Sequence, residues 1–282
     1  MSEPTFNIKQ SLVLYYYHHS YFFKVAVASC KKTFKPRHIH DLRLSMKNLD
    51  ALLELLHEIE PRKKRLPWYP DRLGKLFKVV GELRDVQVLR SELNALEKNL
   101  DVKFGGFRKI FMSQEKDLTG KLKPMLKVSK YLDELQGIKL HLEEVAGKYE
   151  TEQQLEQKVL RHIRLSWRES CRMLKSRHTA SNLHALRINL KHLYYILMVL
   201  RDKKVIWDSL PFNPKELNPF QELLGSWHDL VVFRDKIREI LRQKGKAIPG
   251  HGKMILLMEF LNKEQLRLKR RVRTRGIQLA DL

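Results

Sequence analysis

The sequence predicts an all-α fold in which two similar halves follow one another along the chain. Three observations support this prediction: apolar residues recur at the spacing of a helix, alternation of β-branched residues with a period of two is scarce, and two motifs occur twice at the same offset. With 282 residues, of which 43% are hydrophobic, the chain is long enough to bury one large core or two modest ones.

Each half contains one helix in which the apolar spacing is clearest. The apolar positions are Leu42, Met46, Leu49, Leu53 and Leu56 in the first half, and Leu186, Leu190, Leu193, Leu197 and Leu200 in the second. Pro36 marks the start of the first of these helices, and Ser181 with Asn182 marks the start of its counterpart. Proline-rich stretches, at 61–70 and in "PFNPKELNP", follow the two helices. In order, we expect helices over residues 8–33, 37–59, 69–98, 104–127, 129–148, 151–177, 182–203, 215–243 and 252–274.

Two motifs are repeated at one offset of 144 residues. "HDLRLSMKNL" begins at His40 and "HALRINLKHL" at His184, while "GELRDVQVLR" begins at Gly81 and "GSWHDLVVFR" at Gly225. An internal duplication is the simplest explanation, because two separate motifs would not share an offset by chance. The two repeats are expected to span residues 1–145 and 146–282.

The chain carries a large excess of positive charge. Lysine and arginine total 55 against 32 acidic residues, which gives a formal charge of +23. Such an excess opposes a compact fold unless an anion neutralises part of it. Nucleic acid, an anionic membrane surface or a phosphate polymer is therefore the expected kind of partner.

No membrane-spanning segment is expected, because Lys24 and the pair His18 and His19 interrupt the most apolar stretch. Only two cysteines are present, Cys30 and Cys171, which excludes a disulfide framework and favours a reducing compartment. "VASC", which ends at Cys30, resembles a lipoprotein cleavage box, but a signal needs an uncharged apolar core before its cleavage site. We therefore expect a cytoplasmic protein.

The repeated histidine motif places three basic side chains on one face of a helix. At about 100° per residue, His40, Arg43 and Lys47 fall within a sector of roughly 60°. The matching stripe of the second repeat consists of His184, Arg187 and Lys191. A basic stripe opposite an apolar one is commonly a solvated helix face. A solvated face, however, does not require the same three residue types twice at fixed spacing, so we interpret the stripes as anion-binding surfaces near helix starts.

These motifs resemble those of a known family. "HDLRLSMKNL" with "LGKLFKVVGELRDVQVL", followed by "LHALRINLKHLYYIL" with "FQELLGSWHDLVVF", resembles the CHAD family, the conserved histidine α-helical domain, over nearly the whole chain. The resemblance implies two tandem four-helix bundles related by pseudo-two-fold symmetry, with basic residues lining a central groove that binds inorganic polyphosphate. The residues that it implicates are His40, Arg43, Lys47, Arg84, His184, Arg187 and Lys191. We add five further basic residues to the expected polyphosphate site: His192, Lys24, Lys31, Arg168 and Lys175.

The chain departs from the family pattern at several positions. Asn48 and Asp50 stand where a basic run often continues, Tyr194 replaces an expected arginine, and His228 replaces the arginine of the second "RD" pair. These changes leave open how many phosphates the site engages. We further expect the motif histidines to take up protons when phosphate binds, so that binding tightens in acid.

Metal chemistry is not expected. A di-iron bundle needs E-x-x-H on two helices, and only Glu54 with His57 fits. His38 and His40 lie two positions apart and therefore point to different helix faces, which argues against a zinc site.

Phosphate hydrolysis is not expected either. "WHDL" suggests an HD-type phosphohydrolase, but further His and Asp ligands are not found, and we expect Asp229, like Asp85, to orient neighbouring cations. "EIEPR" differs from the E-x-E-x-K strand of the CYTH domains that often accompany this family, and no Walker loop is present. The sequence therefore predicts a binding module that is not an enzyme and needs no cofactor.

The leading alternative is an RNA- or DNA-binding helical protein. The net charge and the run "RLKRRVRTR" favour it, although such a run is also typical of a solvated basic helix. Base stacking would require exposed aromatic residues, whereas "LYYYHHSYFF" and "HLYYIL" are expected to pack in the core. Polyphosphate has no bases to stack, so it is the favoured partner, and the protein could associate with polyphosphate granules. The sequence indicates no oligomeric state.

Overall fold

The computed structural model describes residues 7–60, 71–176, 178–200, 207, 210–244 and 251–280. Over these ranges the chain is helical and contains no strand, so the predicted all-α class is confirmed. The α-helices are α1 (Ile8–Lys32), α2 (Pro36–Ile59), α3 (Asp71–Leu100), α4 (Gly105–Leu122), α5 (Leu132–Gly147), α6 (Glu152–Lys175), α7 (Ala180–Val199), α9 (Pro214–Lys244) and α10 (His251–Ala280), and two 3-10 turns, η1 (Lys123–Met125) and η2 (Val128–Tyr131), join α4 to α5. The prolines of 61–70 and the predicted helix end at 203 lie outside the described residues.

Local sequence sets several of the helix starts. Asn7 and Thr151 each form a capping box, in which their side chain accepts a hydrogen bond from the backbone amide three residues later. Thr179 caps α7 with its side chain in the same way, so this helix begins two residues before the predicted start. Pro36 occupies the first position of α2, where its missing N–H costs nothing.

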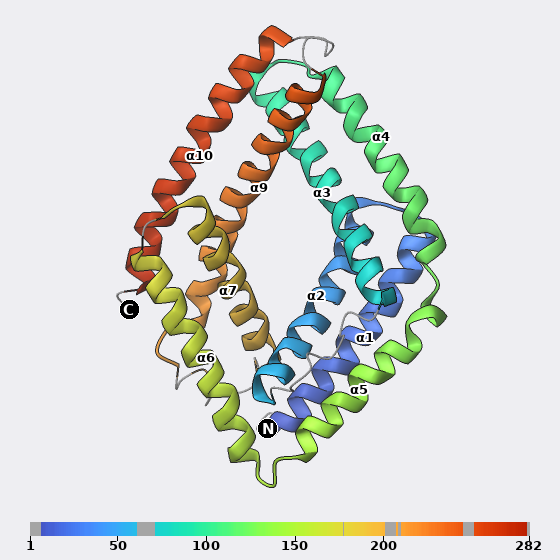
Figure 1. The fold of residues 1–282 in the computed structure, drawn as a ribbon, viewed down its shortest axis with the longest axis vertical. Helices are drawn as coiled ribbons and strands as arrows, with labels where there is room; N and C mark the ends of the chain where they lie inside the picture. The colour runs from blue at the N-terminus through green and yellow to red at the C-terminus, as the bar shows by residue number, and fades with distance from the viewer. Residues whose placement is uncertain are drawn as a thin grey trace, which may run out of the picture.

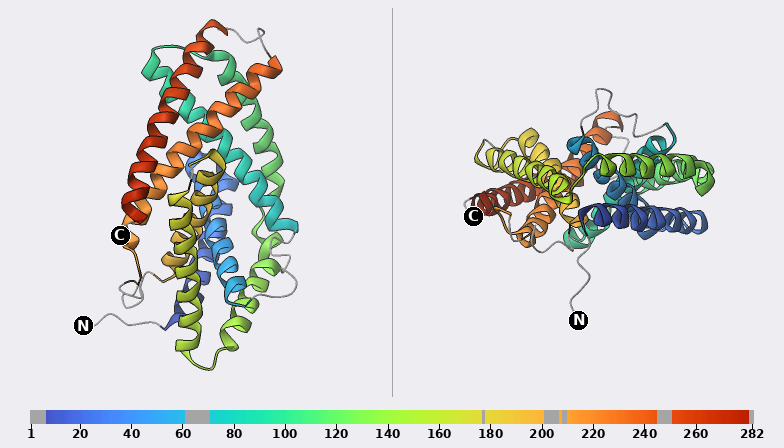
Figure 2. Two further views of the ribbon diagram at one scale, coloured as in Figure 1. Left: turned by 60° about the vertical axis from the view of Figure 1, so that its left-hand side comes forward. Right: turned by 90° about the horizontal axis from the view of Figure 1, so that it is seen from below.

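The helices form a flattened, diamond-shaped frame (Figure 1). Its lower part contains α1, α2, α5, α6 and α7, and its upper part contains α3, α4, α9 and α10 (Figures 1 and 2). In the lower part, α2 and α7 pack against each other, and α1 and α6 pack on their outer sides. The helices that carry the two predicted basic stripes therefore meet in the interior of the frame.

Two hydrophobic cores hold the frame together, and each one uses residues from both halves of the chain. The larger core includes Phe23 and Leu53 from the first repeat and Trp167 and Trp227 from the second. The smaller core joins Phe104, Phe107 and Phe111, in and just before α4, to the apolar faces of α9 and α10. These faces contribute Phe233 and Ile237 from α9 and Leu257 and Leu261 from α10. The predicted division at residue 145 thus describes a sequence repeat and does not separate two independent cores.

The helix positions repeat at the offset of the motifs. Glu152, which begins α6, follows Ile8, which begins α1, by 144 residues, and Ala180 of α7 follows Pro36 of α2 by the same number. The pairs α1 and α6, and α2 and α7, are therefore equivalent in sequence position. Matching residues on α2 and α7 come together where these two helices pack.

The aromatic cluster of α1 is only partly a packing cluster. Tyr16 and Phe23 are buried, as predicted, but Tyr17, Tyr21 and Phe22 are 49%, 64% and 48% exposed. The prediction that the whole cluster packs in the core was therefore wrong, because its six tyrosine and phenylalanine rings extend round more of the helix than one buried face can cover. No described helix is long and apolar enough to cross a membrane.

Candidate anion-binding site

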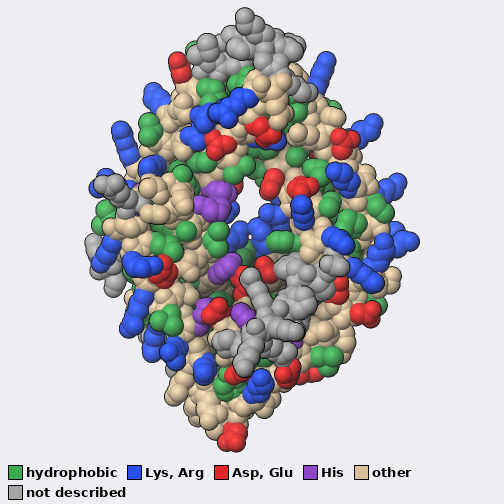
Figure 3. Space-filling view, in the orientation of Figure 1, with side chains coloured by type: hydrophobic (Ala, Val, Ile, Leu, Met, Phe, Trp, Pro, Cys, Tyr) green, Lys and Arg blue, Asp and Glu red, His purple; other side chains and the backbone are tan. Residues whose placement is uncertain are grey.

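Equivalent cations from the two repeats meet between α2 and α7. Arg43 and Lys47 of α2 lie close to Arg187 and Lys191 of α7, and the side chains of Lys47 and Lys191 share a hydrogen bond. Both arginines act electrostatically on this lysine pair. We call these four residues the central cluster. In the space-filling view, an opening near the middle of the molecule is bordered by lysine and arginine below and by histidine at one side (Figure 3).

The two lysines of the central cluster disturb each other's protonation. Burial lowers the pKa of Lys47, and the nearby charges of Lys191, Arg43 and Arg187 lower it further. The pKa of Lys191 is also lowered, mainly by burial, although the hydrogen bond with Lys47 opposes this effect. Lys47 is thus the amine that more readily loses its proton, and it then accepts a hydrogen bond from the Lys191 ammonium. A bound anion would favour the protonated form of both amines.

The guanidinium of Arg43 is held in place by α3. Its Nη2 lies 3.9 Å from Oδ1 of Asp85, and its Cζ lies 5.5 Å from the centre of the Phe77 ring. It also lies over Gly81, where an added Cβ would come within 2.1 Å of Nη1. A Cβ added at the counterpart, Gly225, would meet nothing within 4 Å, so the second repeat lacks this contact. Sequence reasoning missed this role of Gly81, although the glycine opens the repeated motif.

Two carboxylates stand at matching positions beside the central cluster. Asp85 on α3 and Asp229 on α9 are exposed, and each interacts electrostatically with cluster cations. Arg84 joins them from α3, where burial lowers its pKa and Asp229 opposes that effect. The two carboxylates cannot neutralise the four cations of the central cluster and the additional cation Arg84, so a net positive charge remains. Among the residues that the structure describes, no group of His, Cys, Asp and Glu side chains could hold a metal ion.

The two motif histidines occupy different environments. His184 lies beside His228 of α9, with 4.9 Å between the ring centres. Burial lowers the pKa of His228 to about 4, and Arg187 and His184 add to this effect. His40 is exposed, and its Nδ1 lies 3.2 Å from Oδ1 of Asp41, a neighbour that the second repeat lacks because alanine stands there. His184 therefore lies with His228 beside Arg187, whereas His40 pairs with Asp41 at an exposed position one turn before Arg43.

Of the other predicted site residues, His192 directly follows Lys191, whose charge acts on it, and the rest lie outside the central cluster. His192 directs its Nδ1 to Glu54, at 3.1 Å, on the neighbouring turn of α2. Lys24 and Lys31 on α1, and Arg168 on α6, are exposed on helices that pack on the outer sides of α2 and α7. Lys175, at the end of α6, borders a separate cavity described below. These cations lie on amphipathic helices, and because the apolar faces of α1 and α6 pack inward, their charged side chains are on the outside.

An aromatic cavity of about 550 Å³ adjoins the central cluster between α1, α2 and α7. The ammonium nitrogen of Lys191 lies 5.9 Å from the centre of the Tyr195 ring in its wall. Deeper in, the Tyr15 hydroxyl donates a hydrogen bond to Oδ1 of Asn48 at 3.0 Å. Aromatic side chains from both predicted packing clusters line the cavity: Tyr15, Tyr17, Tyr194 and Tyr195. The cavity therefore offers ring faces directly beside cationic side chains.

Comparisons with known proteins agree with the helical fold. The fold is similar to that of the CHAD domain from the plant Ricinus communis, with a TM-score of 0.70 and 17% sequence identity over 96% of this chain and 91% of that chain. At this identity the likeness concerns the fold. A search of curated proteins found no match. The family model described as the CHAD domain matches residues 26–238, most of the chain's 282 residues, and the chain therefore belongs to the CHAD family.

Proposed function

We propose that this protein binds inorganic polyphosphate at the central cluster and does so without catalysis. The observation that carries the proposal is the meeting of Arg43, Lys47, Arg187 and Lys191, beside which the described part of the chain places only the carboxylates of Asp85 and Asp229. Placing like charges together lowers the stability of the free protein unless a polyanion binds there. Membership of the CHAD family, which is associated with polyphosphate, supports the same ligand.

The chemistry of the central cluster suits a chain of phosphates. Polyphosphate carries about one negative charge per phosphate and offers oxygen acceptors along its whole length, so it is best bound by several charge-assisted donors. Arginine supplies two parallel N–H donors, and lysine supplies a mobile point charge. Because the donors come from both repeats, one ligand chain would bridge α2 and α7.

The bridging arrangement can be tested by neutralising one arginine from each repeat. We expect Arg43→Gln and Arg187→Gln each to weaken binding of long-chain polyphosphate, and the double variant to lose most of it. The matched control is the double variant Arg161→Gln with Arg164→Gln, which removes two exposed charges from the outer helix α6. Titration calorimetry measures the affinities of the two single variants, the central double variant and the control. If the control weakens binding as much as the central double variant, net charge alone governs binding and the proposed site is wrong.

The absence of catalysis is a separate part of the proposal. We expect no release of orthophosphate when the protein is incubated with polyphosphate and Mg²⁺. A malachite-green assay over several hours measures this release, and turnover above the protein-free control would contradict the proposal.

We also propose that the protein accompanies polyphosphate granules in the cytoplasm, which fluorescence microscopy of a tagged chain would check.

A second candidate function, binding of single-stranded nucleic acid, is favoured by the aromatic cavity. Bases stack on aromatic rings while their phosphates contact nearby cations, and Tyr194 and Tyr195 lie beside Lys191. If RNA is the ligand, Tyr194→Leu should weaken binding of an RNA oligonucleotide and leave polyphosphate binding unchanged. The control Tyr21→Leu removes an exposed ring that does not line the cavity. Competition between unlabelled polyphosphate and labelled RNA ranks the two ligands.

A further inference from the structure

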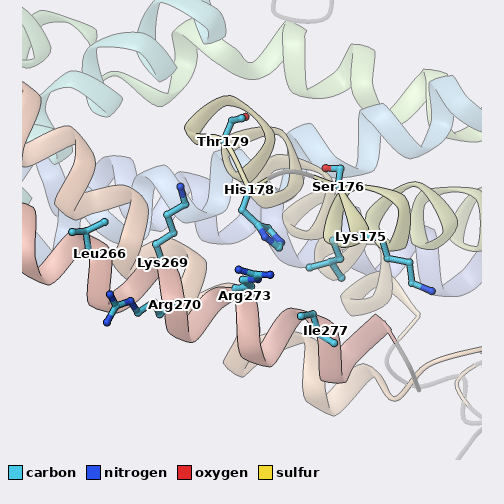
Figure 4. Close-up of a pocket in the computed structure, with 10 residues that line it drawn as sticks. Lys175, Ser176, His178, Thr179, Leu266, Lys269, Arg270, Arg273 and Ile277 are labelled. Atoms are coloured by element: carbon cyan, nitrogen blue, oxygen red, sulfur yellow. The ribbon is translucent and has the colours of Figure 1, made fainter.

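A second basic cavity lies outside the central cluster, where the end of α6 and the start of α7 face α10 (Figure 4). Its volume is about 750 Å³. Its apolar lining residues are Leu174, which is buried, and Leu266 and Ile277, which are 58% and 46% exposed. Its basic side chains are His178 and four cations, Lys175, Lys269, Arg270 and Arg273. Three of these cations belong to the run "RLKRRVRTR", which the central cluster does not use.

The side chains of this cavity differ in direction. Lys269 rises from α10 toward the start of α7, and the guanidinium of Arg273 lies close to the imidazole of His178 (Figure 4). Arg270 points away from His178, and the Lys175 ammonium extends to the far side of the cavity (Figure 4). We call Lys269, Arg273 and His178 the inner group; Lys269 and His178 are partly buried, whereas Arg273 is exposed, as are Arg270 and Lys175.

The inner cations have no acidic partner within the described part of the chain. Neither Lys269 nor Arg273 forms an ion pair with a described carboxylate. On the same helix, Arg267 pairs with Glu264, its Nη2 2.8 Å from Oε2, and Arg275 pairs with Glu216. In the basic run, Arg267 and Arg275 are thus paired with glutamates, and Lys269, Arg270 and Arg273 line the cavity, while Arg271 neither pairs with a described carboxylate nor lines the cavity.

His178 gives a second, independent sign of a missing ligand. Its Nε2 atom is buried and has no hydrogen-bond partner among the residues that the structure describes. Burial lowers the pKa of His178, and the charges of Arg273 and Lys269 lower it further. A buried polar atom without a partner is uncommon in proteins and calls for an explanation. The His178 ring already hydrogen-bonds the backbone of Leu174, so its free nitrogen can donate only when the ring is protonated; an anion between the three side chains would favour that protonated form, accept a hydrogen bond from Nε2–H and offset the two cations.

The cavity is also firmly built. Gly276 brings α10 close to α6, since an added Cβ would lie 2.6 Å from Cδ2 of Leu174 and 3.3 Å from Cζ of Phe220. Thr179 caps the 20-residue helix α7 at the cavity wall, so the positive end of this helix faces the same space. A site held by packed helices loses little freedom when a ligand binds.

We propose that this cavity is a second anion site, distinct from the central cluster, that binds a compact phosphate group through Lys269, Arg273 and His178. The phosphate belongs either to the end of a polyphosphate chain or to a phosphate ester whose apolar part contacts Leu174, Leu266 and Ile277. In either case the recognition chemistry is the same: two cations and one imidazole around phosphate oxygens.

The test uses the full chain with the central cluster weakened by Arg43→Gln and Arg187→Gln, so that the second site is observed alone. Calorimetric titration with inorganic tripolyphosphate should show one remaining site. Adding Lys269→Gln with Arg273→Gln should lower its affinity at least tenfold. The matched control, Arg267→Gln with Arg275→Gln, removes two charges from the same helix outside the inner group and should leave the affinity within about twofold.

A second readout follows His178 directly. On addition of tripolyphosphate, the ¹⁵N resonances of its imidazole should move toward those of the protonated ring, and the signal is assigned by its loss in His178→Gln. Titration with phenyl phosphate distinguishes the two ligand sources: tighter binding than tripolyphosphate assigns the site to esters, and weaker binding assigns it to polyphosphate ends. The proposal is overturned if neither ligand binds, if the control loses as much affinity as the inner pair, or if the His178 signals do not move. Long-chain binding by a variant that carries only Lys269→Gln and Arg273→Gln reports separately on the central cluster.

Discussion

Replacing Lys47 by methionine should abolish most of the proton uptake that we expect when polyphosphate binds to the central cluster. In the free protein, burial and the charges of Lys191, Arg43 and Arg187 lower the pKa of Lys47 below the ordinary lysine value of about 10.4. A bound polyanion supplies the missing negative charge and raises that pKa again. Between the free and the bound pKa values, the complex therefore holds more protons than the separate partners.

The sign and size of the pH effect follow from linkage. Since the bound state holds the extra proton, affinity increases as the pH falls through this window and decreases as the pH rises. An uptake of about one proton corresponds to a tenfold change in affinity per pH unit, or about 1.4 kcal/mol. We expect one proton, because Lys47 and Lys191 share a hydrogen bond in which one amine is the acceptor. From pH 9 to pH 8, wild-type affinity should therefore rise about tenfold.

Calorimetry at pH 8 and pH 9, in two buffers of different ionisation enthalpy, measures the uptake directly. Long-chain polyphosphate keeps the ligand's own contribution small, because only its two ends titrate near neutrality. Histidine contributes little at these pH values, since its ordinary pKa is about 6.5. Lys47→Met should reduce the uptake to near zero, while Lys116→Met, on an exposed position of α4, should leave it unchanged. The reasoning is refuted if wild type takes up no proton at pH 8, or if Lys47→Met takes up as many as wild type.

Three further predictions concern packing and salt. Gly81→Ala should displace the Arg43 guanidinium and weaken polyphosphate binding severalfold without loss of thermal stability. Gly225→Ala, whose added Cβ meets nothing within 4 Å, should leave the affinity unchanged, and equal affinities of the two variants would contradict the contact between Gly81 and Arg43. Gly276→Ala should lower the free energy of unfolding by about 1–3 kcal/mol through overpacking, while Gly137→Ala, in an open part of α5, should raise it by up to about 1 kcal/mol, as urea denaturation would show. Polyphosphate affinity should fall with salt at a slope of about 0.7 per neutralised phosphate, as for single-stranded nucleic acid, and a flat response between 50 and 200 mM salt would exclude an electrostatic site.

The helices could be predicted well from the sequence because helix formation depends on local spacing. The pattern around Leu42 and Leu186 defines an apolar face within one helix, and no distant contact is needed to recognise it. The offset of 144 residues is likewise a property of the sequence alone, and the starts of α1, α2, α6 and α7 follow it. The basic residues of the central cluster could be predicted for the same reason, because the spacing of Arg43 and Lys47 in the motif places both on one face of a helix.

The tertiary structure decided which of these charges act together, because distances between helices depend on packing across the whole chain. Only the contact of α2 with α7 brings Lys47 to Lys191 and lowers the pKa of both amines. His40 and His184 have the same place in their motifs, yet His40 is exposed and contacts Asp41, while His228 of α9 lies beside His184. The second cavity joins His178 to Arg273, which are nearly a hundred residues apart, so no local pattern predicts it. The sequence by itself therefore determined the helices, the repeat and the kind of ligand to expect, whereas the packing of α2, α7 and α10 determined where uncompensated charge gathers.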